Sequence, residues 1–482
     1  MMMGGGVRPT ARVAAQDETA NIPGLATHIG FGDPLDALVD RVRPVAARSV
    51  DGLQVAAALE ASGITDRAAR VEFGFDDVFD LADEIHRRVI PADDAPRRRP
   101  ARVWSAELRD IGHGAMYLLP AALFPPALAA LGRDVSVLGI VLAAAIGWVW
   151  SGATAWLDYQ LLGQHRNRAV GILMRWSLVA VLPVAAVAAV SVASATGVGY
   201  GLVIMATAQA AYQMACTVLV FYHREGLVFA SMMPAVAAGV AYVAAGPAIL
   251  TLAIVVGLLS VAGAVGLAVG QTLGRGSPDE PPLAESLNGK LRPFLPVLAF
   301  TALSAAFFLW PQARHFLDGY VAVAALPLIM GMGVVEWRAR RFGDDARALL
   351  ARVSRPRQFG FRVWLLVLGG LGLCLLAVST LAAVLLFVLA RGGQLTPATT
   401  AMAGASVLLA GAYFLGFVLA NKGRYGWLCG SLLLCLGLYL AAGPSLAGVL
   451  ADTTAFLAAT AMLVVLYLTA LASCVHEAHR HR

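Results

Sequence analysis

The sequence predicts an all-α integral membrane protein with about twelve transmembrane helices, arranged as two six-helix repeats behind a small helical N-terminal segment. Three observations predict this fold. Only 14% of the 482 residues are charged and 59% are hydrophobic, with a mean hydropathy of +0.72, whereas a soluble protein carries about 25% charged residues. Apolar runs of about twenty residues, the length needed to cross a bilayer, follow one another from residue 111 onward. Two short motifs recur at equivalent places in the two halves.

The first 110 residues hold much of the charge and divide into three segments. Residues 1–50 are rich in Gly, Ala and Arg and lack periodicity, so we expect them to be disordered. Residues 51–90 contain helix-capping Asp and Thr residues and helix-ending glycines, which predict an acidic module of three short helices. Residues 91–110 form a basic linker rich in Pro and Arg. The core of the module is predicted to contain Leu53, Leu59, Val71, Phe73 and Phe79.

Three short helices in residues 51–89 also suit a helix-turn-helix, but the charge of this segment argues against nucleic acid as a partner. It holds nine acids and four arginines, whereas a phosphate-binding surface needs the opposite sign. We therefore expect the segment to dock a cytoplasmic glycosyltransferase or another protein, to regulate the chain, or only to pack.

Twelve apolar runs predict the transmembrane helices. The first six form a lobe over residues 111–273 and the last six a lobe over 293–475, joined by a cytoplasmic linker at 274–292 and followed by a tail at 476–482. The seventh and eighth runs are the shortest, and each contains proline. The helices are expected near 112–132, 135–158, 171–195, 199–222, 227–245, 248–273, 293–311, 318–336, 361–390, 398–420, 425–442 and 454–475.

The loops between these runs predict the orientation. Alternate loops and the tail hold nineteen Lys and Arg residues, while the loops on the other side hold three. Basic loops stay in the cytoplasm, so both termini are predicted to be cytoplasmic. The composition is rich in Ala and Arg and poor in Lys, which is typical of a bacterial coding bias. We therefore expect a multi-pass protein of a bacterial plasma membrane.

Two motifs predict an internal repeat. One precedes the third helix and recurs before the ninth, and the other lies between helices four and five and recurs between ten and eleven. Because six is an even number, both halves cross the membrane in the same direction, and their symmetry axis runs along the membrane normal. The first pair is Arg166-Asn-Arg168-Ala-Val-Gly171 and Arg355-Pro-Arg357-Gln-Phe-Gly360; the second is Arg224-Glu-Gly226, then Ser231, and Arg424-Tyr-Gly426, then Ser431.

This layout resembles the multidrug/oligosaccharidyl-lipid/polysaccharide (MOP) flippase superfamily. The loop at 162–166 lacks the Gly-Asp-Arg pattern of major facilitators, whereas the long basic loop at 338–362 looks like that of a MOP exporter. The resemblance covers about residues 111–475, is one of layout rather than of a diagnostic motif, and is nearest to the polysaccharide-exporter branch. It implies transport by alternating access, with a cavity between the lobes.

The fourth helix supplies the predicted substrate contacts. Gln209, Tyr212 and Gln213 share one helix face, and amides and a hydroxyl suit an uncharged sugar. Hydrogen bonds between helices are an equally weighted explanation. We expect the cargo to be a polysaccharide or a lipid-linked glycan. The alternatives are a non-transporting scaffold for a cytoplasmic synthase and a small-molecule carrier.

Ionisable residues are expected only at helix ends, where a charged side chain reaches the interface at little cost. Residues 114–132 contain no acid, which argues against ion-coupled drug efflux. Asp158 is the candidate for ion coupling, with an interfacial anchor as the alternative explanation. The four arginines of the first repeated motif (Arg166, Arg168, Arg355 and Arg357) are predicted to bind lipid phosphate or to act only as orientation signals.

No enzyme, metal or cofactor is expected. The tail sequence His476-Glu477-Ala-His479-Arg480 lacks the second histidine of an HExxH zinc motif. The predicted external loops are mostly a few residues long and offer no platform for catalytic groups. The five cysteines lie in apolar runs without CxxC spacing and are expected to be core residues. Membrane lipid is the remaining expected partner.

Overall fold

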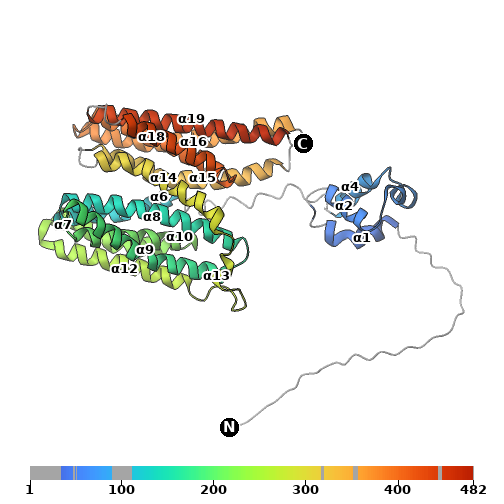
Figure 1. Cartoon of the computed structure of the whole chain (residues 1–482), viewed down its shortest axis with the longest axis horizontal. Coiled ribbons are helices and arrows are strands. Elements are labelled where there is room, and N and C mark those ends of the chain that lie inside the picture. Colours follow the sequence, from blue (N-terminus) through green and yellow to red (C-terminus); the bar gives the residue numbers. More distant parts are fainter. Residues whose placement is uncertain are drawn as a thin grey trace, which may run out of the picture. The chain divides into compact units, whose positions relative to one another are not determined.

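The computed structural model describes residues 34–46, 49, 52–89, 111–315, 320–350, 356–442 and 448–480, without the side chains of residues 350, 356–359 and 474–480. The chain divides into two compact units, Met1–Val103 and Trp104–Arg482. We call them the N-terminal unit and the membrane unit and describe each by itself (Figure 1).

Short helices build the N-terminal unit: α1 (Pro34–Ala46), α2 (Gly52–Ala61), α3 (Asp66–Ala68) with the π-helical turn η1 (Ala69–Phe73), and α4 (Val78–Val89). The capping signals explain their bounds. An Asp77 carboxylate oxygen accepts the backbone N–H groups of Phe79 and Asp80, both at 2.9 Å, and so caps α4. Gly74 ends η1 in a left-handed conformation, which costs glycine little.

Two sequence-based expectations for this unit are wrong. Helix α1 lies within the segment expected to be disordered, because its apolar residues recur at helical spacing and are buried with those of α2 and α4. The predicted core is also wrong at three positions: Leu53, Val71 and Phe79 are 65%, 77% and 49% exposed. The core is filled instead from α1, by Leu35, Leu38, Val39 and Val42.

The membrane unit is built from long apolar helices. The described residues form eleven continuous helical segments that are long and apolar enough to cross a membrane. One of them, Glu225–Thr272, contains two helices that pack against each other after a 3-10 turn. Twelve passes result, as predicted.

The passes of the first lobe are α6 (His113–Leu118), η2 (Leu119–Leu123) and α7 (Phe124–Leu131) as one pass, then α8 (Arg133–Leu162), α9 (Asn167–Thr196), α10 (Gly201–Phe221), α11 (Glu225–Ala245), and α12 (Leu250–Thr272) after the turn η3 (Gly246–Ile249). A short helix, α13 (Leu283–Ser286), lies in the linker. The second lobe contains α14 (Leu291–His315), α15 (Leu326–Leu350) after η4 (Ala322–Ala325), α16 (Pro356–Arg391), α17 (Pro397–Asn421), α18 (Tyr425–Ala442) and α19 (Val449–Arg480).

The lobes share one plan. Figure 1 shows the helices of the first lobe, in cyan to green, beside those of the second, in yellow to red. The fourth helix of each lobe, α10 or α17, is the most buried helix of that lobe. In its most apolar stretch, 50% of the residues of α10 and 78% of those of α17 are buried. Helix α10 packs on α8, α9 and α12, and α17 packs on α15, α16 and α19. Equivalent helices therefore occupy equivalent central positions.

Equivalent turns support the repeat as well. The N–H of Arg224 donates to the carbonyl of Leu219 at 2.8 Å, and the N–H of Arg424 donates to that of Leu419 at 3.1 Å. The residue before each arginine, His223 or Gly423, has a positive φ (55° and 70°). One of the two repeated motifs therefore makes the same helix-ending turn in both lobes. The other motif includes Arg355, which lies outside the described residues.

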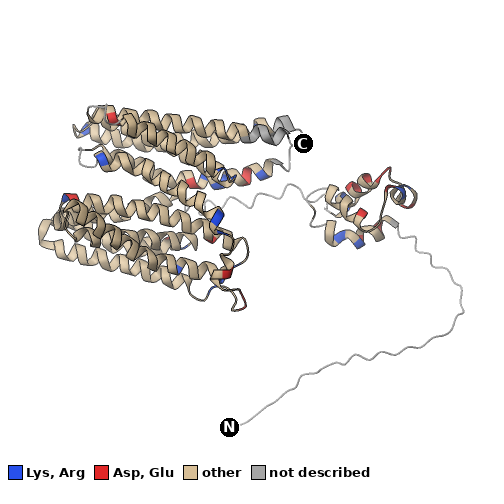
Figure 2. Ribbon diagram, viewed as in Figure 1, with Lys and Arg blue, Asp and Glu red and all other residues tan. Residues whose placement is uncertain are grey.

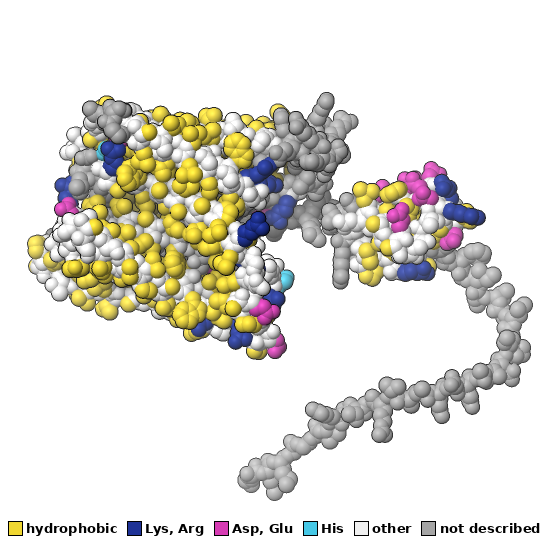
Figure 3. All heavy atoms as spheres, in the orientation of Figure 1, with side chains coloured by type: hydrophobic (Ala, Val, Ile, Leu, Met, Phe, Trp, Pro, Cys, Tyr) yellow, Lys and Arg dark blue, Asp and Glu magenta, His cyan; other side chains and the backbone are white. Residues whose placement is uncertain are grey.

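Charge lies at the two ends of the membrane unit. Figure 2 shows Lys, Arg, Asp and Glu at the helix ends and uncharged residues between them, and Figure 3 shows an apolar belt over the same face. We call the end at which α6, α9, α11, α14, α16 and α18 begin the basic end. Its location in the cytoplasm stays a prediction from the Lys and Arg count.

Candidate functional site at the lobe interface

The two lobes meet along a first seam between α8 and α14. Aromatic side chains fill this seam. The ring of Trp148 lies 5.9 Å from that of Phe308 and 5.4 Å from that of Tyr413 on α17, and Trp156 lies 6.3 Å from Phe294. Tilted aromatic pairs at these distances pack favourably.

A second seam joins α6 to α15. Gly114 lies against the backbone of Met330, and a Cβ atom at position 114 would collide with the Met330 carbonyl. In both seams, the first helix of one lobe contacts the second helix of the other. The interface therefore has the two-fold relation that a duplicated six-helix unit predicts.

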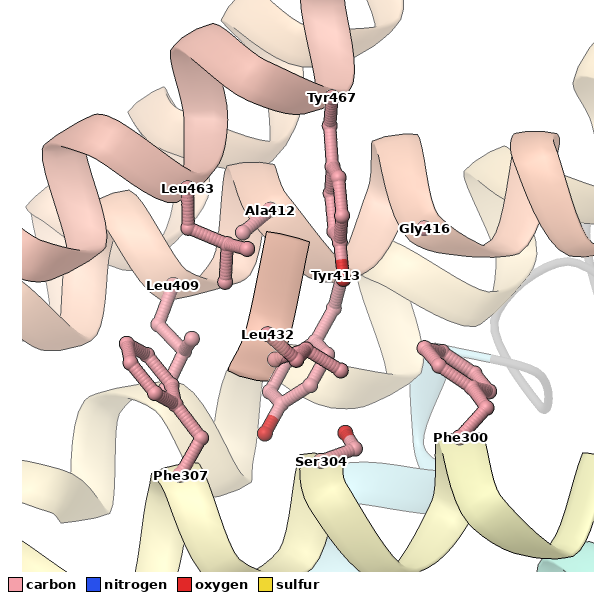
Figure 4. Close-up of a pocket in the computed structure, with 10 residues that line it drawn as sticks. All are labelled: Phe300, Ser304, Phe307, Leu409, Ala412, Tyr413, Gly416, Leu432, Leu463 and Tyr467. Atoms are coloured by element: carbon pink, nitrogen blue, oxygen red, sulfur yellow. The ribbon is translucent and has the colours of Figure 1, made fainter. Parts of the chain in front are cut away.

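A pocket lies inside the second lobe, next to the first seam (Figure 4). Its volume is about 10 Å³, which is the room that one water molecule needs. Tyr413 lines it and also contacts Trp148 of the first lobe. No charged side chain lines the pocket; its residues are Phe300, Ser304, Phe307, Leu409, Ala412, Tyr413, Gly416, Leu432, Leu463 and Tyr467.

Ionisable groups meet at the second seam. His113 Nε2 lies 3.3 Å from Glu225 Oε1, and His113 Nδ1 lies 3.6 Å from Glu336 Oε2. His113 is 1% exposed and Glu225 4%. Although His113 lies at a helix end, its side chain is buried, because α11 and α15 cover the start of α6. Glu225 was not predicted as a site residue, because the predicted fifth helix began at residue 227 and left Glu225 in the loop before it. Helix α11 begins at Glu225.

Asp158 is buried, so the alternative explanation of an interfacial anchor is wrong. It is 0% exposed, and neither carboxylate oxygen has a hydrogen-bond partner among the described residues. The Tyr222 hydroxyl and Arg175 Nε are likewise buried without a partner in that part of the chain. Burial raises the pKa of Tyr222, with Arg275 lowering it and Asp158 raising it further. Asp158, Arg175 and Arg275 therefore all lie near Tyr222, at the basic end of the first lobe.

A third group of ionisable residues lies at the opposite end of the second lobe. Asp452 accepts hydrogen bonds from Arg314 Nη1 at 2.9 Å, the Tyr439 hydroxyl at 2.7 Å and His315 Nε2 at 2.5 Å. Asp452 is 3% exposed. The last helix was predicted at 454–475, which leaves Asp452 in the loop before it. Helix α19 begins at Val449, which puts this carboxylate in its first turn.

The predicted substrate residues lie inside the first lobe. The Tyr212 hydroxyl donates to the carbonyl of Met116 at 2.7 Å. Pro120, four residues after Met116, lacks the N–H that would serve this carbonyl in an α-helix. Gln213 lies against α8, where its amide oxygen is buried without a partner among the described residues, and Gln209 is half-buried. The Tyr212 bond joins two helices, as the alternative explanation expects. A substrate role for Gln209, Tyr212 and Gln213 stays a prediction.

Of the four arginines predicted to bind lipid phosphate, Arg168 already has a protein partner. Its guanidinium donates to the carbonyl of Pro278 at 2.7 Å, and its backbone N–H donates to Glu280 at 2.8 Å. The backbone N–H groups of Ser277 and Arg168 hold the pKa of the Glu280 carboxyl below its usual range, partly opposed by desolvation. Arg166 precedes α9 and is half-buried. Arg355 and the side chain of Arg357 lie outside the described residues. Within the part of the chain described, no group of three or more His, Cys, Asp or Glu residues is placed to hold a metal ion.

No family model matches the sequence, and no curated protein does either. Solved structures do match. An outward-facing multidrug resistance MATE family transporter of the MOP superfamily has a TM-score of 0.53 at 12% identity, covering 78% of this chain and 97% of that one. The membrane unit has the fold of a MATE transporter.

Two further solved structures are similar to the chain. One described as "protein A" has a TM-score of 0.51 at 16% identity and covers 78% of this chain and 96% of that one. A MATE multidrug transporter, DinF-BH in complex with R6G, has a TM-score of 0.48 at 14% identity with the same coverage. At these identities the likeness identifies the fold. It agrees with the predicted MOP layout and does not distinguish the polysaccharide-exporter branch from the drug transporters.

Proposed function

We propose that this chain is a membrane transporter that works by alternating access of its two lobes. The observation that carries the proposal is the pair of symmetry-related seams, α8 with α14 and α6 with α15. In the described region, ring contacts and backbone proximity make up much of these seams, and the His113–Glu336 contact is an ionisable pair that crosses one of them. When such surfaces separate, they break few hydrogen bonds or ion pairs. A scaffold has no need of two equivalent sliding seams.

A polysaccharide or a lipid-linked glycan is the cargo class we propose. The pocket beside the first seam combines aromatic rings with the hydroxyls of Ser304, Tyr413 and Tyr467 and has no charged lining residue (Figure 4). The Tyr413 hydroxyl is buried without a hydrogen-bond partner among the described residues. Rings and hydroxyls suit the faces and the hydroxyls of a sugar. Because the pocket holds about one water, cargo would enter only after the lobes move.

The test uses purified protein in liposomes and a named probe, an NBD-labelled disaccharide on a polyprenyl diphosphate. Dithionite quenches the probe in the outer leaflet, so continued quenching reports flipping. We expect flipping above the rate of empty liposomes. Gly114→Val should slow it, because valine collides with the Met330 carbonyl at the seam. Gly266→Val is the matched control, since a Cβ there meets nothing within 4 Å.

A glycan transporter, a small-molecule carrier and a non-transporting scaffold would give different results in this assay. Flipping of the glycan probe that is lost in Gly114→Val supports the proposal. Uptake of ethidium without flipping of the glycan probe would favour the small-molecule carrier. Neither activity, in protein that elutes as a single folded species, would favour the scaffold.

The N-terminal unit supports a second role, which we propose as docking of a protein partner. Leu53, Val71 and Phe79 are exposed on a unit whose net charge is acidic over residues 51–89. A photo-crosslinking amino acid at 53 or 79 should trap a discrete partner in cells. The same group at Glu60, an exposed polar position, is the control. Equal trapping at all three positions would contradict a specific surface.

A further inference from the structure

The contact of His113 with two carboxylates joins both lobes. His113 begins α6 and Glu225 begins α11, both in the first lobe, whereas Glu336 lies on α15 in the second. The imidazole lies 3.3 Å from Glu225 and 3.6 Å from Glu336. Opening of the lobes at the basic end would therefore separate His113 from Glu336 and leave the contact with Glu225 intact.

The protonation state of His113 decides how strong this contact is. A neutral imidazole carries one N–H, and its other nitrogen only accepts. Facing two carboxylates, it can donate to only one of them at a time. An imidazolium has two N–H groups and a positive charge, so it serves both carboxylates at once. One proton therefore strengthens the link between the lobes.

Other ionisable groups surround the three residues. On α15, Arg340 acts on the imidazole, and on α10, Cys216 faces both carboxylates. His223, in the turn before α11, lies 3.9 Å from Glu225 with a 66% exposed side chain. On α6 itself, Tyr117 faces Glu336, and Tyr212 of α10 faces Tyr117. Of these groups, His223 is the second histidine, and it faces Glu225 from within the first lobe.

The backbone shows that this contact lies at a close approach of the lobes. Gly114, next to His113, leaves no room for a Cβ atom beside Met330 of α15. The side chains of His113 and Glu225 are 2% and 5% exposed, and that of Glu336 is 29% exposed. The site is therefore more open on the Glu336 side than on the Glu225 side.

We propose that His113, Glu225 and Glu336 form a proton-operated latch that holds the two lobes together at the basic end. With His113 doubly protonated, the latch is closed. Loss of one proton releases Glu336 and favours separation of the lobes. The closed state binds one more proton than the open state. The ratio of closed to open molecules therefore falls as pH rises, by at most about tenfold per pH unit. The latch rests on the proposed movement of the lobes.

The test measures the distance between the lobes. Spin labels are placed at Asn167 in the first lobe and Lys422 in the second, both exposed at the basic end, after the native cysteines are replaced. Pulsed electron paramagnetic resonance on protein in lipid nanodiscs then gives the distance distribution at several pH values. We expect one short distance at acidic pH and a growing longer population as pH rises.

Matched variants assign the pH dependence to one histidine. His113→Asn should abolish it and give the longer distance at every pH. Glu336→Gln, which keeps hydrogen-bonding atoms but loses the charge, should weaken it. His223→Asn should leave it unchanged, since His223 contacts Glu225 alone. A thermal unfolding midpoint measured for each variant shows that the fold survives.

Either of two results would overturn the latch: a distance distribution of the wild type that does not change with pH, or a pH dependence that persists in His113→Asn. These outcomes are separable from failure of the proposed function. Glycan flipping with a pH-independent distance would refute the latch alone. A His113-dependent distance change without glycan flipping would refute the proposed cargo and leave the latch standing.

Discussion

Replacing Asp452 tests how the second lobe holds a buried charge. The Asp452→Ala variant removes three hydrogen bonds at once, from Arg314, His315 and Tyr439. At the membrane average of about 0.6 kcal/mol per bond, the loss is about 2 kcal/mol. Breaking a buried ion pair costs about 3–5 kcal/mol. Because the Arg314 side chain is 41% exposed and can turn to water, we expect about 2–3 kcal/mol.

The assay is unfolding in mixed micelles by titration with SDS. Asp134→Ala is the matched control, because Asp134 is exposed and also lies in the first turn of its helix, so both variants lose the same favourable interaction with the helix dipole. A double-mutant cycle with Tyr439→Phe isolates one of the three bonds. We expect a coupling free energy of at least about 0.5 kcal/mol. If Asp452→Ala is no less stable than Asp134→Ala, the three bonds do not stabilise the lobe and the reasoning fails.

Three further predictions follow from buried or bridging groups. Asp158→Leu should raise the free energy of unfolding by about 1–3 kcal/mol, because it removes a buried carboxylate without a hydrogen-bond partner among the described residues. Flipping lost in the same variant would show that Asp158 serves transport, and a lower free energy of unfolding would contradict the argument. Tyr212→Phe should lower the free energy of unfolding by about 0.6 kcal/mol, because it removes the bond to Met116, and flipping should be retained. Lost flipping at wild-type stability would instead support Tyr212 as a cargo-binding residue. The link of Glu280 to the Arg168 N–H is present above the usual Glu pKa and is lost as pH falls through the lowered value. Glu280→Ala removes the acceptor, so hydrogen exchange at the Arg168 amide should be faster than in the wild type at neutral pH, and equal rates in the two proteins would rule out that bond.

The helices could be predicted from the sequence because hydropathy is local. A run of about twenty apolar residues is helical in a bilayer whatever surrounds it, since each backbone group must bond within its own segment. The predicted run at 425–442 matches α18 residue for residue, and 398–420 differs from α17 by one residue at each end. Helix α1 was missed because it has a short amphipathic pattern in a charged segment, where composition pointed to disorder.

The repeat was predictable in part. The motif at Arg224 and Arg424 marks a turn whose bonds are all within a few residues, so the sequence carries it. The position of the lobes on each other is not local. Gly114 contacts Met330, and Trp148 contacts Tyr413, across more than two hundred residues of chain. The MATE-like fold therefore followed from layout, while the seams required the structure.

By itself, the sequence determined that this chain is helical, crosses a membrane about twelve times and is duplicated, because apolar length and helix-ending turns are encoded in consecutive residues. Only the tertiary structure decided which ionisable groups are buried. His113, Asp158 and Asp452 all lie near the ends of apolar runs, where a charged side chain normally reaches water. Neighbouring helices cover them. The partners of two of them are remote in sequence, since Arg314 is 138 residues from Asp452 and Glu225 is 112 residues from His113. Burial and pairing depend on what packs alongside, and no window of a single helix contains that information.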